Sequence, residues 1–266
     1  MAPDSPSSTQ LLSSVAAILQ AVAWPIVAAI FLLIYRVRIG SLLDILSQKL
    51  ATASKVKAWQ LELDNTSEDI KDAVQKAGAA ANPESTLGKI SRSQVQAAEE
   101  VRDKIRNSPL PDARALPAVR EQLNALIQEY DLARRNLPTG FVRTKKMTAI
   151  VAGMRALSLA ALPLQSQLIS DPSPGARLAA ICMLQISPDP DYFDWLVERL
   201  NKEDQAFILC QTAVALLELV GSGNLEANAQ VRDAISGALR HVSNFNNGHP
   251  DQNTVEILQS ALAKAG

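Results

Sequence analysis

The chain has 266 residues, with 26 lysine and arginine residues against 27 aspartate and glutamate residues. The resulting net charge of −1 argues against a nucleic-acid-binding protein, which normally carries a basic excess. Two cysteines exclude a disulfide-rich scaffold, and only two histidines are present, so we expect no metal site. Aromatic residues make up only 4% of the chain while alanine and leucine abound, which predicts an all-α fold.

An uncharged apolar segment lies near the N-terminus, at residues 15–35. A helix of its 21 residues rises roughly 30 Å, which matches the hydrocarbon core of a bilayer, so we expect a transmembrane helix. A buried core helix is an alternative. A cleaved signal peptide is another, but residues 1–14 lack the basic residues that it requires. The residues assigned to the membrane anchor are Val15, Gln20, Trp24, Pro25, Phe31 and Tyr35, with a mild kink expected at the proline.

A basic collar follows the apolar segment, with five basic residues and one acid in residues 36–60. The positive-inside tendency places this side in the cytoplasm, which predicts a single-pass protein of the inner (cytoplasmic) membrane with its short tail, residues 1–14, outside. Residues 36–63 also carry an apolar stripe at helical spacing. This amphipathic segment either lies along the anionic inner leaflet or forms a stalk that packs on a neighbouring chain. The collar residues are Arg36, Arg38, Lys49, Lys55 and Lys57.

The middle of the chain, residues 64–143, is polar, and we interpret it as a helical linker region. Its apolar spacing and capping residues predict three helices, over about 66–77, 94–107 and 117–135. We expect Pro117 in the first turn of the third helix, where its missing amide hydrogen costs nothing.

Dense apolar helices separated by proline-containing turns fill residues 144–266, which we interpret as one helical domain. The string DPSPGARLAAICML resembles the HEAT-repeat family, and AAICML and TAVALL recur at a spacing of 32 to 33 residues. The string VRDAISGAL at 231–239 resembles the same helix at a shorter spacing. The resemblance implies paired repeat helices that bind proteins along a stacked surface. The overall layout is similar to uncharacterised bacterial single-pass membrane proteins.

Three residues of this domain are candidates for protein binding, namely Arg177, Tyr192 and Trp195. The alternative for Arg177 is an ion pair with an acid on a neighbouring turn or helix. The acids at 189, 191 and 194 lack the spacing of a calcium loop and are expected to cap helices. No GxSxG, P-loop, GxGxxG or HExxH motif occurs, so we expect no catalytic residue and no cofactor.

These observations favour a membrane-anchored scaffold or adaptor that presents a cytoplasmic helical domain to a protein partner. The alternative is a membrane effector, of a bacterial signalling or defence system, whose transmembrane helix oligomerises and permeabilises the bilayer. Gln20 motivates the alternative, because a polar side chain within a span can mediate helix association. The expected partners are the lipid bilayer, an unidentified cytoplasmic protein and further copies of the chain, but not nucleic acid.

Overall fold

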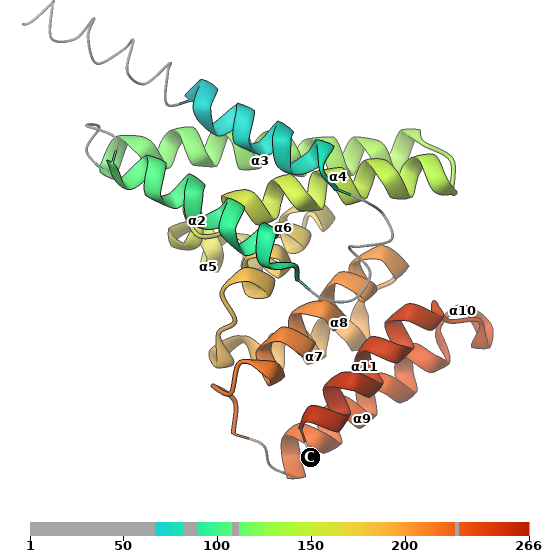
Figure 1. Ribbon diagram of the computed structural model, residues 1–266. Coiled ribbons are helices and arrows are strands. Elements are labelled where there is room, and N and C mark those ends of the chain that lie inside the picture. Colours follow the sequence, from blue (N-terminus) through green and yellow to red (C-terminus); the bar gives the residue numbers. More distant parts are fainter. Residues whose placement is uncertain (1–66, 82–89, 108–111, 227–228, 266) are drawn as a thin grey trace, which may run out of the picture. The chain divides into compact units, whose positions relative to one another are not determined.

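The computed structural model describes residues 67–81, 90–107, 112–226 and 229–265. All of them belong to the second of two compact units, Leu61–Gly266. Regular secondary structure in these residues is entirely helical, which confirms the expected all-α class for the described part of the chain (Figure 1). The anchor, the basic collar and the amphipathic segment lie outside the described residues.

The helices follow one another with short connections. They are residues 67–79, α2 (Arg92–Asn107), α3 (Asp112–Asn136), α4 (Phe141–Leu157), α5 (Gln165–Ser170), α6 (Pro174–Ile186), α7 (Phe193–Lys202), α8 (Ala206–Gly221), α9 (Ala229–Ser243), α10 (Phe245–Gly248) and α11 (Gln252–Lys264), with 3₁₀ turns η1 (Leu162–Leu164) and η2 (Pro190–Tyr192).

The helices form a two-layer stack. One layer is the series α4, α6, α8 and α11, in which each helix packs on the next. The other layer contains α5, α7 and α9, which pack on α6, α8 and α11 respectively. The central helices α6 and α8 are buried nearly all round, since every residue from Ile208 to Leu217 of α8 is buried. Such an apolar surface on all sides is expected of a helix enclosed by its neighbours.

Two of the three similar sequence strings lie in helices that occupy neighbouring positions in one layer. AAICML lies in α6 and TAVALL in α8, and these two helices pack directly on each other. VRDAISGAL lies in α9, which belongs to the other layer, while the helix stacked on the far side of α8 is α11. The shorter spacing of the third string therefore reflects a different position in the stack.

The described helices of the middle region belong to the same compact unit as the C-terminal helices. Helices α2 and α3 pack on α4, and α3 also packs on α6. The boundary expected between residues 143 and 144 falls inside α4. The apolar stripe of α3 is covered by α4 and α6. Pro117 lies inside α3 rather than in its first turn, because the helix begins earlier, at Asp112.

A glycine at the start of α6 permits its close approach to α3. A Cβ on Gly175 would lie 2.6 Å from the backbone oxygen of Ile127, so any side chain would push the helices apart. The α6 N-terminus is also fixed by polar contacts. Ser173 caps it by accepting from the amide of Ala176, and Asp131 of α3 accepts from the amide of Gly175 at 3.1 Å.

Candidate interaction surfaces

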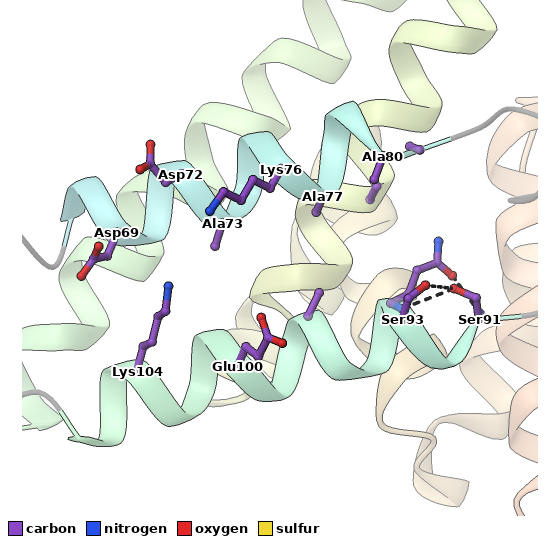
Figure 2. A pocket seen from close by; sticks show the side chains of 14 residues that line it. Asp69, Asp72, Ala73, Lys76, Ala77, Ala80, Ser91, Ser93, Glu100 and Lys104 are labelled. Carbon is purple, nitrogen blue, oxygen red and sulfur yellow. Dashed lines mark hydrogen bonds between the residues drawn. The ribbon is translucent and has the colours of Figure 1, made fainter.

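A groove of about 370 Å³ lies between the 67–79 helix and α2 (Figure 2). Both helices pack on α4, and Ala152 of α4 lines the groove between them. The approach of the first helix to α4 is close, since a Cβ on Gly153 would lie 3.0 Å from the side chain of Val74. Six alanines line the groove: Ala73, Ala77, Ala80, Ala81, Ala97 and Ala152.

Charged side chains of both signs edge this groove. Asp69 and Lys104 project into the gap from opposite sides (Figure 2). Among the residues that the structure describes, Asp69, Asp72, Lys76 and Lys104 form no ion pair. A groove with small residues at its base lets a helix approach closely, and the unpaired charges are available to a bound chain. Sequence analysis did not predict this groove, because its two walls come from helices that were expected to belong to a linker region.

A second cavity, of about 380 Å³, lies where α3 meets the N-termini of α6 and α8. Arg134, Arg135, Pro174, Gln205 and Asp131 line it. The buried phenol of Tyr130 donates to the Oε1 of Gln205 at 3.2 Å, and burial raises its pKa well above the usual range. Both carboxylate oxygens of Asp131 are already occupied, since one accepts from Ser173 and the other from the amide of Gly175. The cavity is therefore richer in free donors than in free acceptors.

Arg177 forms an ion pair next to this cavity. Its Nε donates to Glu203 at 3.1 Å, and its Nη1 donates to the carbonyl of Pro172 at 2.6 Å. The Glu203 side chain is almost fully buried, with 1% exposed, so the guanidinium supplies the countercharge that burial requires. An ion pair with a nearby acid is the alternative that the sequence analysis gave for Arg177. The side chain of Arg177 is 16% exposed.

Tyr192 and Trp195 are half-buried and pack against the core at the start of α7. The guanidinium of Arg199 lies 6.0 Å from the centre of the Trp195 ring, within the range of a cation–π contact. Asp189 caps the turn before α7 by accepting from the amide of Asp191, which confirms the capping role expected there. These two aromatic residues and Arg177 remain candidates for binding, and the structure does not join them into one cavity.

The centre of the stack contains a polar network that sequence analysis missed. Arg155 of α4 is fully buried, and its Nε donates to Gln185 at 2.7 Å while its Nη2 donates to Gln211 at 3.0 Å. Its Nη1 has no hydrogen-bond partner, and no carboxylate within the described part of the chain bonds to the guanidinium. Burial lowers the pKa of Arg155. The three side chains come from adjacent helices of one layer, so they fix the alignment of α4, α6 and α8.

Both cysteines, Cys182 and Cys210, are buried free thiols. Burial raises the pKa of Cys182 to about 12 and that of Cys210 to about 11, so neither is a reactive thiolate at neutral pH. Among the described residues, no group of histidine, cysteine and acidic side chains is arranged to hold a metal ion.

A search of the described residues finds no single helix of sufficient length and hydrophobicity to cross a bilayer. One bent pair, Phe141–Leu157 with Leu162–Ser170, passes by length and composition together. Comparison of the chain with protein-family models, with curated proteins and with solved structures gave no match.

Proposed function

We propose that the protein is a membrane-anchored scaffold whose helical domain binds a partner protein. The uncharged segment at residues 15–35 supplies the anchor, and the basic collar that follows keeps the helical domain on the cytoplasmic side. The stack of helix pairs supplies a rigid frame. This arrangement resembles the family of HEAT repeats in its sequence strings, and that family binds proteins.

The observation that carries the proposal is the groove between the 67–79 helix and α2. It is open, its base is made of alanines, and its edges carry charges without partners among the described residues. The occupant that fits is an amphipathic helix with small side chains on one face and charges of both signs beside them. Such a helix would complete the layer that the 67–79 helix and α2 begin on the surface of α4.

The test fills the groove and asks whether a partner is lost. Ala97 lines the groove and Ala263 is an exposed alanine of α11, so tryptophan at each position is a matched pair. The full chain is purified from native membranes in mild detergent, with a photo-crosslinking residue at Ala73. We expect a defined crosslinked protein that disappears in A97W and persists in A263W, with circular dichroism unchanged in both.

Two results would contradict the proposal. One is a crosslinked partner that remains equally abundant in A97W, since the groove would then not hold it. The other is a chain that folds, stays monomeric and yields no crosslink from the groove under any native condition. A crosslink to a second copy of the same chain would identify the occupant as the protein itself and overturn the assignment of a separate partner.

A further inference from the structure

The end of the α3–α4 hairpin exposes apolar side chains that nothing in the described residues covers. Phe141 is 70% exposed and Val142 is 67% exposed, while Leu132 on the last turns of α3 is 49% exposed. They are the large hydrophobic residues most exposed in the described part of the chain. Buried residues of α4 begin only at Met147, so the first turns of α4 extend beyond the core.

Basic residues are frequent in the sequence around these apolar residues. Residues 131–146 include five basic residues and a single acid. That acid, Asp131, bonds to Ser173 and Gly175 at the start of α6 and forms no ion pair with a described basic residue. Lys146 pairs with Glu129, whereas Lys145 is exposed and forms no ion pair with a described residue. We define the hairpin tip as these side chains: Leu132, Arg134, Arg135, Phe141, Val142, Arg143 and Lys145.

We propose that the hairpin tip is a second membrane contact, which docks the helical domain on an anionic bilayer surface. The turn that joins α3 to α4 lies at one end of this helical pair (Figure 1). Phe141 and Val142 follow that turn and are largely exposed, which suits insertion into a planar surface. Phe141 and Val142 enter the boundary between headgroups and acyl chains, as apolar side chains of interfacial elements do. The basic side chains meet the negative headgroups, each contributing about 1 kcal/mol near such a surface.

This contact differs from the anchor in position and in chemistry. The anchor is an uncharged segment that would cross any bilayer of suitable thickness, whereas the tip requires negative lipid. The tip also makes the domain lie against the membrane instead of extending from it, which fixes the side of the domain that a partner can reach.

The test places an environment-sensitive probe at the tip of the full chain. Val142→Cys is labelled with a nitrobenzoxadiazole maleimide, and the unsubstituted chain shows the background, since Cys182 and Cys210 are buried. Gln259→Cys, at an exposed position of α11, is the matched control. Each labelled chain is incorporated into nanodiscs of phosphatidylcholine alone or of an equal mixture of phosphatidylcholine and phosphatidylglycerol. A chain that purifies without detergent is mixed with vesicles of the same two compositions.

We expect the probe at Val142 to shift its emission to the blue and to resist dithionite only in the anionic bilayers, with no change at Gln259. Lys145→Gln in the V142C background lowers the ratio of protected to exposed probe by about fivefold, which is the effect of one basic residue. Added salt lowers that ratio further, because the attraction is screened.

Three outcomes would overturn the inference. The probe at Val142 could remain exposed in anionic bilayers, which removes the contact. Equal protection in neutral and anionic bilayers would remove the role of the basic residues. Protection that follows the ratio of protein to lipid, and not the lipid charge, would identify a second copy of the chain as the occupant. None of these results bears on the anchor or on the groove, so the scaffold proposal is tested separately.

Discussion

Removal of one acceptor from the buried Arg155 network should destabilise the helical stack. Gln185→Leu leaves the Nε of Arg155 without a partner, in addition to the Nη1 that already has none. A hydrogen bond to a charged group contributes about 1.5–3 kcal/mol, and removing one partner of a buried charged cluster costs about 3–5 kcal/mol. Because Gln211 still accepts from Nη2, we use the lower end of the range of about 3–5 kcal/mol. We expect the free energy of unfolding to fall by about 3 kcal/mol.

The assay is urea unfolding of the compact unit Leu61–Gly266, followed by circular dichroism. The control is Gln259→Leu, the same exchange at an exposed position. Replacement of all three network residues by apolar ones, with Arg155→Met and both glutamines to leucine, should restore stability to at least that of the parent, because the buried charge is gone. The reasoning is refuted if Q185L unfolds at the same urea concentration as the parent, or if the triple variant is less stable than Q185L.

Three further predictions use the same assay. Arg177→Met should lower the free energy of unfolding by about 3 kcal/mol, because it leaves the buried carboxylate of Glu203 without its countercharge. Lys202→Met removes one partner of an exposed ion pair and should leave the free energy of unfolding close to the parent value. Equal effects of the two substitutions would contradict this prediction. Gly175→Ala should cost more than about 1 kcal/mol through its clash with α3. Gly237→Ala should add about 0.5–1 kcal/mol, because a Cβ there would meet only the end of the Arg240 side chain at 3.9 Å, and a reversed order would refute the packing. The raised pKa of Cys182, about 12, means that the folded state keeps a proton that the unfolded state loses above pH 9.0. The Cys182 thiol should therefore lower stability between pH 9 and 12 with a slope of about 1.4 kcal/mol per pH unit, and Cys182→Ala should remove this contribution to the slope; an unchanged slope would contradict the burial of the thiol.

The sequence predicted the helices of the stack better than it predicted their association. Apolar spacing and proline-containing turns predicted a series of helices over residues 144–266, where the structure has α6, α7 and α8, because the pattern of 3.6 residues per turn is local. The start of α3 was placed too late, since a proline inside a helix looks like a helix start. The packing of α2 and α3 on α4 was not predicted, because apolar spacing shows that a helix has a covered face but not which helix covers it.

Some features of the candidate surfaces could also be predicted from the sequence, and others could not. The contact between Arg177 and an acid could be anticipated, because a basic residue at a helix start after a tight turn commonly reaches one. The groove, the buried Arg155 and the hairpin tip could not, since each depends on which face of a helix is covered by its neighbours. Arg155 lies in an apolar helix and gives no local sign that its partners are glutamines of α6 and α8.

Alkaline carbonate extraction tests the central claim, membrane anchoring of the helical domain, most directly. The full chain and a variant lacking residues 15–35 are expressed in bacteria, and their membranes are washed with carbonate, which removes peripheral proteins. The account predicts that the full chain stays in the pellet while the shortened chain is released as a folded helical protein. Release of the full chain into the supernatant, or retention of both chains in the pellet, would contradict it.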